Sequence, residues 1–215
     1  MEGSTELSFY YSFITQYMYL NPNTNIQGDL VLVDNPTTKV VSVTDIKSHL
    51  RIDSSDEDAL LGLYIDAATE MAEHYCNRHF ITHEYKLYFN SVVSQASLIF
   101  PDCVLKTQGS NKPIHWIDSG GTEQESTDAY IDAYSNPSIA YLNSNFTTPT
   151  LKEDSANSFW IEFKTGFGDA ATDVPDAIKQ AIKLIVSDMY YFREDRKRRF
   201  PMASEILLQP YKCYH

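Results

Sequence analysis

The chain has 215 residues, of which 43% are hydrophobic, and its formal net charge is −12 at pH 7. This composition allows one sizeable core, or one core with a smaller satellite lobe, and argues against two large domains. The acidic balance argues against a protein that coats or reads nucleic acid, because phosphate binding depends on surplus Lys and Arg. It does not exclude a protein past which DNA slides. No stretch approaches the ~20 apolar residues of a membrane span, so we expect no membrane contact and a cytosolic protein when it is made.

The first part of the chain predicts an extension, a strand and a short helix. Residues 1–29 are aromatic and polar and end in a run of Asn and Pro, which indicates an N-terminal extension. A short strand is predicted at Leu30–Val33. Ser42 is a plausible N-cap with Asp45 three residues later, so a helix of about two turns should run to Leu50.

A second helix start follows, where Ser55 precedes Asp58 by three residues and the first turn is acidic. Apolar residues then recur at steps of three and four, which predicts an amphipathic helix over about 56–76. They are Leu60, Leu61, Tyr64, Ile65, Ala68, Met71, Ala72 and Tyr75.

Between residues 80 and 167 the pattern changes to short runs of aromatic and β-branched residues separated by turn residues, which is typical of antiparallel strands. The predicted strands are Tyr85–Phe89, Ser97–Phe100, Ile114–Ile117, Tyr130–Tyr134 and Phe159–Phe163. We therefore expect an antiparallel β lobe inserted between helices.

Helical signals return at Asp173, which can cap a helix that has Pro175 near its first position. Ile178, Ile182, Ile185, Met189 and Phe192 follow as one apolar stripe. A basic run, Arg193–Arg199, should end this helix before Pro201, and a short final helix should stop at Pro210. The expected fold is α+β: an antiparallel helical frame over about 42–76 and 174–209, with the β lobe inserted at about 80–167.

Three blocks of residues resemble the head–tail connector (adaptor, or head-completion) proteins of tailed phages. The first is Val43–Asp53 with Asp56–Leu61 and Ile65–Glu70, which looks like the family's short helix, acidic linker and long helix. The second is Phe163–Asp169 followed by Val174–Ile182 and Tyr190–Glu194. The third, Ile206–Lys212, looks like the family's terminal Leu-Leu-x-Pro-Tyr-Arg element. The matching domain would be residues 30–215, after the extension 1–29.

The resemblance implies a structural virion protein and not an enzyme. Family members form closed rings, here a cyclic homo-oligomer of about a dozen subunits, between the portal protein and the tail or stopper protein of the neck. Such a ring extends the channel through which DNA passes without sequence-specific binding. The implied location is the virion neck, after assembly in the host cytoplasm, and no cofactor is implied.

Other chemistry is poorly supported. His74, Cys76, His79 and His83 could suggest zinc, but His74 and Cys76 point in different directions on a helix. Gly166-Phe167-Gly168 lacks the remaining residues of a phosphate-binding loop and predicts a tight turn. No nucleophile elbow or hydrolase carboxylate pair is recognisable.

A different class of function stays open, a small-ligand or carbohydrate-binding β-rich module. Its sequence basis is a set of aromatic residues in the predicted strands: Trp116, Tyr130, Tyr134 and Trp160. A metal-dependent hydrolase centred on the histidines is a further alternative.

The basic run holds five of the chain's 17 Lys and Arg residues: Arg193, Arg196, Lys197, Arg198 and Arg199. Cations suit the negative end of a helix dipole, so a solvated helix end is one interpretation. An interface with an acidic partner or neighbouring subunit is the other, and nucleic-acid binding ranks below both. We take these five residues and Tyr211 as the predicted partner or subunit interface.

Overall fold

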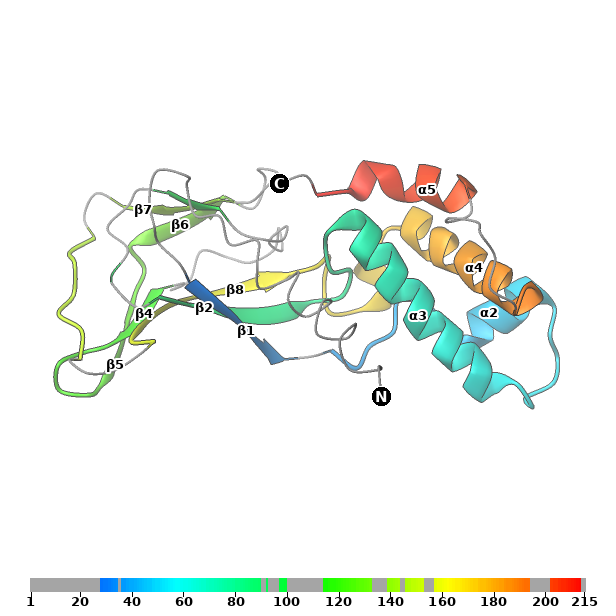
Figure 1. The fold of residues 1–215 in the computed structure, drawn as a ribbon, viewed down its shortest axis with the longest axis horizontal. Coiled ribbons are helices and arrows are strands. Elements are labelled where there is room, and N and C mark those ends of the chain that lie inside the picture. Colours follow the sequence, from blue (N-terminus) through cyan, green and yellow to red (C-terminus); the bar gives the residue numbers. More distant parts are fainter. Residues whose placement is uncertain are drawn as a thin grey trace, which may run out of the picture. The chain divides into compact units, whose positions relative to one another are not determined.

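The computed structural model describes residues 28–34, 36–89, 92, 97–99, 114–132, 139–143, 146–152, 157–193 and 202–213. The chain forms two compact units (Figure 1). The sheet unit comprises the described parts of Met1–Asn35 and His83–Thr165. The helical unit comprises those of Pro36–Thr82 and Gly166–Tyr214. The α+β fold class is therefore confirmed. The part of the sheet unit from β2 (His83–Phe89) to β8 (Phe159–Thr165) is inserted between the two halves of the helical unit, whereas β1 (Gly28–Asp34) joins the sheet from before the helical unit.

All strand pairs of the sheet unit are antiparallel. A five-stranded sheet has the order β1-β2-β8-β4-β5, and a three-stranded sheet has the order β3-β7-β6. The strands are β1 (Gly28–Asp34), β2 (His83–Phe89), β3 (Ser97–Ile99), β4 (Ile114–Ile117), β5 (Glu123–Ser126), β6 (Ala129–Asp132), β7 (Ile139–Leu142) and β8 (Phe159–Thr165). Sequence patterns had indicated six of these strands and missed β5 and β7. β5 reads Glu-Gln-Glu-Ser, so it has no apolar alternation to reveal it.

The core of the sheet unit comes from alternate residues of β2 and β8, the period expected for a half-buried strand. Tyr85 lies opposite Phe163, with ring centroids 5.7 Å apart, and Phe89 lies opposite Phe159 at 6.0 Å. Ile131 and Leu142 of the three-stranded sheet pack against this cluster. The opposite face of β2 and β8 carries mainly charged and aromatic side chains.

The helical unit contains α2 (Val43–Leu50), α3 (Asp58–Cys76), α4 (Asp176–Tyr191) and α5 (Met202–Leu208), with short 3-10 turns at Ala171–Asp173 and Gln209–Tyr211. The predicted capping box at α2 is confirmed: the Asp45 amide donates to Ser42 Oγ, and the Ser42 amide donates to the Asp45 carboxylate. For α3 the predicted cap is wrong. Its N-cap is Glu57 and not Ser55, and no side chain caps the helix.

α3, α4 and α5 pack together around one core. Their buried residues include Leu61, Ile65, Ala68, Ala72, Cys76, Ile178, Ala181, Ile182, Ile185, Val186 and Leu208. Most of the two predicted stripes is therefore confirmed. Two members are not: Met71 is 39% exposed, and Phe192 lies beyond the end of α4 and is 52% exposed. α4 thus ends at Tyr191, before the basic run.

The turn at Gly166-Phe167-Gly168 is held against the segment that follows α3. The Phe167 amide donates to the Phe80 carbonyl at 3.0 Å, and the Thr82 amide donates to the Gly168 carbonyl at 3.0 Å. Gly166 has φ +104°, and a Cβ there would lie 2.5 Å from the Ile81 carbonyl oxygen. Only glycine fits this position, because it tolerates positive φ and has no Cβ. The tight turn expected from sequence is therefore present.

The burial of α3 and α4 gives a direct test of the core assignment. Leu61→Asp and Ile182→Asp each place a charge where the native side chain is 0% exposed, so each should destabilise the helical unit by roughly 3–5 kcal/mol. Leu63→Asp is the matched control, since Leu63 is 67% exposed only two residues from Leu61. Circular dichroism melts should show a large decrease in melting temperature for Leu61→Asp and Ile182→Asp, and little change for Leu63→Asp. Three equal melting temperatures would contradict the assignment.

Candidate interaction surfaces

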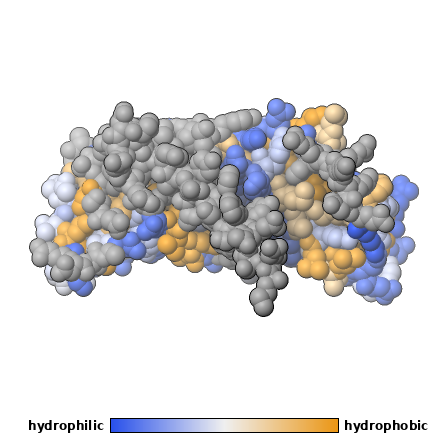
Figure 2. All heavy atoms as spheres, in the orientation of Figure 1, coloured by the Kyte–Doolittle hydropathy of each residue, from blue (hydrophilic) through white to orange (hydrophobic). Residues whose placement is uncertain are grey.

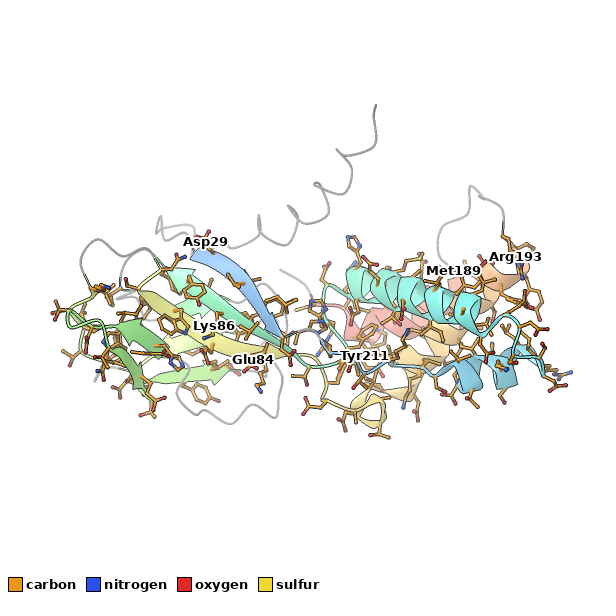
Figure 3. The ribbon with its side chains drawn as sticks, turned by 90° about the horizontal axis from the view of Figure 1, so that it is seen from below. Asp29, Glu84, Lys86, Met189, Arg193 and Tyr211 are labelled. Atoms are coloured by element: carbon orange, nitrogen blue, oxygen red, sulfur yellow. The ribbon has the colours of Figure 1, made fainter. Side chains whose placement is uncertain are left out.

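The two described members of the predicted interface, Arg193 and Tyr211, do not lie together. Arg193 follows α4 and Tyr211 closes the final 3-10 turn, and they lie at opposite ends of the helical unit (Figure 3). Arg196, Lys197, Arg198 and Arg199 lie outside the described residues. Arg193 and Tyr211 therefore belong to two different regions of the helical unit.

Arg193 is engaged within its own subunit. Its Nη2 donates to Glu57 Oε1 at 2.7 Å, and the Tyr190 hydroxyl donates to Glu57 Oε2 at 2.6 Å. The guanidinium also lies 5.3 Å from the centroid of the Tyr190 ring. Glu57 is the residue that precedes α3, so this cluster joins the start of α3 to the end of α4.

The pKa values of the cluster reflect these bonds. The Tyr190 hydroxyl, followed by the Arg193 guanidinium, holds the pKa of the Glu57 carboxyl below its ordinary value of 4.5. The Glu57 carboxylate in turn raises the pKa of Tyr190. Hydrogen bonds that favour the charged form of an acid lower its pKa, so both directions have the same cause.

Tyr211 is half-buried and takes part in an aromatic stack. Its ring meets Phe167 edge-on, with centroids 6.1 Å apart, and the Arg78 guanidinium lies 4.0 Å from the Phe167 centroid. The ring centroids of Phe167 and Phe80 are 6.4 Å apart. Tyr211 thus anchors the end of the described chain to the glycine turn, and only its remaining exposed edge is available to a partner.

The outer face of the five-stranded sheet carries a polar cluster around Trp160. Lys86 Nζ lies 2.7 Å from Glu162 Oε1, and the indole Nε1 of Trp160 donates to the same carboxylate at 3.1 Å. The His115 ring stacks on the Trp160 ring, with centroids 5.4 Å apart and an angle of 8°. Lys86 and Glu84 of this face are labelled in Figure 3. Cross-strand pairs of this kind stabilise a sheet, which accounts for the cluster without a ligand.

The aromatic residues that suggested a ligand-binding module do not form one platform. Trp160 is 5% exposed on the outer face, whereas Trp116 packs against the core on the opposite face. Tyr130 is 49% exposed on β6, and Tyr134 lies outside the described residues. A sugar-binding site needs exposed rings on one side, and the two tryptophans do not provide them.

Cys76 and His79, near the end of α3, take part in the packing of that region. The Cys76 thiol is buried, and burial raises its pKa to about 12. His79 Nδ1 lies 3.1 Å from the Glu73 carboxylate, which also accepts the Phe80 amide at 2.7 Å. Within the described ranges, no three His, Cys, Asp or Glu side chains are grouped so as to hold a metal ion.

Exposed apolar side chains in the helical unit were missed by the sequence reasoning, which looked for the buried stripe of each helix. The largest exposures are those of Met202 at 77%, Leu63 at 67%, Ile206 at 64% and Tyr191 at 63%. Their positions relative to the buried residues of the same helices could have revealed them.

No described helix is long and apolar enough to cross a membrane.

Comparison with known proteins supports a specific class. Residues 40–99 match the sequence model of the phage gp6-like head-tail connector proteins. This segment holds α2 and α3, where the first block of the sequence resemblance lies. The resemblance to head–tail connector proteins is therefore confirmed for this part of the chain. No curated protein sequence gives a significant match.

Solved structures show the same fold over most of the chain. A chain in the neck of an empty gene transfer agent particle, computed with C6 symmetry, has a TM-score of 0.67 at 19% identity and covers 86% of this chain and 96% of that chain. A chain in the neck of the native particle, computed with C12 symmetry, has a TM-score of 0.64 at 20% identity, with the same coverage. At this identity the similarity establishes the fold.

The Glu57 cluster generates a pH-dependent prediction. Because its folded pKa lies below the unfolded value of about 4.5, the carboxylate stabilises the fold above that pH. The contribution is lost as pH falls through the folded pKa. Glu57→Gln should lower the melting temperature by at most a few degrees at pH 7, since the cluster is partly exposed to solvent. Glu70→Gln, at an exposed site of α3, is the control.

Melts of wild type and both variants between pH 7 and pH 3 provide the measurement. The difference between wild type and Glu57→Gln should shrink below pH 4.5. A constant difference across this range would show that the Glu57 charge does not stabilise the fold.

Proposed function

We propose that this chain is a structural neck protein of a tailed phage or phage-like particle, a subunit of the ring that joins the portal to the tail or stopper. The observation that carries the proposal is the agreement of two comparisons. The connector family model matches residues 40–99. The structural match extends over nearly the whole length of chains from particle necks. The C6 and C12 symmetry with which those necks were computed supports a cyclic arrangement of copies.

The function is mechanical. A closed ring of identical subunits extends the portal channel, and the next neck component docks on its free rim. The net charge of −12 suits this role, because an acidic wall does not retain the DNA that passes through it. No catalytic step is part of the proposal. The protein acts in the virion neck and is made in the host cytoplasm.

The basic run is proposed as a contact with an acidic surface of a partner or neighbouring subunit. Arg193 is paired with Glu57, so it anchors the start of the run to the helical unit. Arg196, Lys197, Arg198 and Arg199 then follow in sequence as the residues for the intermolecular contact. Opposite charge on two surfaces raises association rates and selects the partner.

The neck assignment is tested by deleting the gene from the particle that encodes it. Particles should accumulate as heads without attached tails when viewed by electron microscopy, and supply of the wild-type chain should restore attachment. Supply of Leu61→Asp, which is expected to unfold the helical unit, is the matched negative control. Complete, tailed particles from the deletion strain would rule out the proposed function.

The role of the basic run is tested by changing Arg196, Lys197, Arg198 and Arg199 to Ser together. We expect a folded chain whose assembly with purified portal rings is at least about ten-fold slower at low salt, because electrostatic steering is lost. Wild-type assembly should weaken as salt rises, since charges are screened over about 8 Å at ~0.15 M salt.

Arg193→Ser is the comparison variant. Because Arg193 bonds to Glu57 within the subunit, this change should lower the melting temperature more than it lowers the rate of assembly. Light scattering gives the assembly rate. A quadruple variant that assembles at the wild-type rate in low salt would show that the run is a solvated segment, and a loss restricted to DNA affinity would favour nucleic-acid binding.

A further inference from the structure

α3 carries a second apolar face besides the one buried in the helical core. Ala59, Leu63, Ala67 and Met71 follow one another at steps of four, so they form a continuous ridge along one side of the helix. All four are exposed, Leu63 at 67% and Met71 at 39%. We call these four residues the α3 ridge. Figure 2 shows hydrophobic atoms gathered where Figure 1 places α3.

α5 has a smaller apolar surface of the same kind. Met202 and Ile206 are four residues apart on this helix and are 77% and 64% exposed, while Ser204 and Leu208 are buried. We call Met202 and Ile206 the α5 pair. Both helices pack against α4 in the same unit, so each turns one face inward and leaves one apolar face outward.

An apolar face on the outside of a helix favours contact with another molecule. A surface helix of a single globular domain normally shows water a polar face, and apolar residues on two sides indicate burial on both. Leaving them exposed forgoes about 25 cal/mol for each Å² of apolar surface that could be buried. The ridge is also regular, since residues in an i, i+4 row form the ridges with which helices pack.

Charged residues of opposite sign accompany the two surfaces, around the α3 ridge in the structure and before the α5 pair in the sequence. Exposed acidic residues, Asp56, Asp66 and Glu70, precede or flank the α3 ridge, and Lys39 pairs with one of them, Asp66, at 2.6 Å. The basic residues Arg196–Arg199 precede the α5 pair in the sequence, separated from Met202 by Phe200 and Pro201. The α3 ridge therefore has acidic residues beside it, and the α5 pair follows a basic run in the sequence. A head-to-tail ring requires two different, mutually complementary surfaces on each subunit.

We propose that the α3 ridge of one copy packs against the α5 pair of the next copy. Leu63 is the central contact of the ridge, and Ile206 is its counterpart on α5. This inference rests on the proposed ring, and it names the two surfaces through which the ring closes.

The test uses the full chain with single charged substitutions. Leu63→Glu blocks the ridge and Ile206→Glu blocks the α5 pair, and both sites are exposed, so both variants should keep the wild-type melting temperature. Gln180→Glu on an exposed site of α4 adds the same charge and is the matched control. Sedimentation velocity measures self-association up to about 1 mM, a concentration that detects binding as weak as about −4 kcal/mol.

We expect wild type and Gln180→Glu to self-associate, and each blocked variant to lose at least about ten-fold in affinity, which corresponds to one ordinary interface hot spot. The decisive sample is an equal mixture of the two blocked variants. Each retains the surface that the other lacks, so the mixture should form a one-to-one dimer that cannot grow further.

Three results would overturn the proposal. They are a wild-type chain that stays monomeric to about 1 mM, an Ile206→Glu variant that associates normally, and a mixture that forms no dimer. Loss of association in Leu63→Glu alone would indicate that the ridge meets itself or another segment, such as the aromatic N-terminal extension. None of these results bears on tail attachment in the gene deletion, so failure of this inference and failure of the proposed function remain distinguishable.

Discussion

The close approach of two distant segments of backbone determines how this chain is organised. The segment after α3 and the glycine turn exchange hydrogen bonds between Phe80 and Phe167 and between Thr82 and Gly168. Beyond this point the chain enters β2 at His83 and returns from β8 at Thr165, and these two residues are paired in register. The strands from β2 to β8 can therefore be inserted without separating α3 from α4. Gly166 makes the approach possible, because any side chain there would collide with the Ile81 carbonyl.

The helical unit combines a tightly packed inner side with an unusually apolar outer side. α3 contributes Leu61, Ile65 and Ala68 to the core, while Leu63 and Ala67, only one or two residues away, remain exposed. The isolated subunit gains its stability from the first set. The second set adds little to that stability, because it is exposed in the subunit. In the proposed ring this second set would be covered by another copy, so one helix would serve both the core and the subunit contact.

The basic run illustrates how one sequence feature can have two physical roles. Arg193 forms charge-assisted bonds with Glu57 and stacks on Tyr190, so it belongs to the packing of the helical unit. The four cations that follow Asp195 carry the proposed contact with a partner. Sequence composition alone gave all five cations the same role.

The sequence by itself determined the α+β class, the capping box at Ser42, the position of Pro175 at the start of α4, and most of the two buried stripes, because local periodicity reports which side of an element avoids water. Asp173, which was expected to cap α4, lies instead in the 3-10 turn before it. Three blocks of residues also determined the resemblance to connector proteins. Only the tertiary structure decided that Glu57 and not Ser55 precedes α3, that Phe192 lies outside α4, and that Trp116 and Trp160 face opposite ways. It also separated Arg193 from Tyr211. Each of these outcomes depends on contacts between residues far apart in the chain, such as Glu57 with Tyr190, and such contacts leave no pattern in the sequence near either partner.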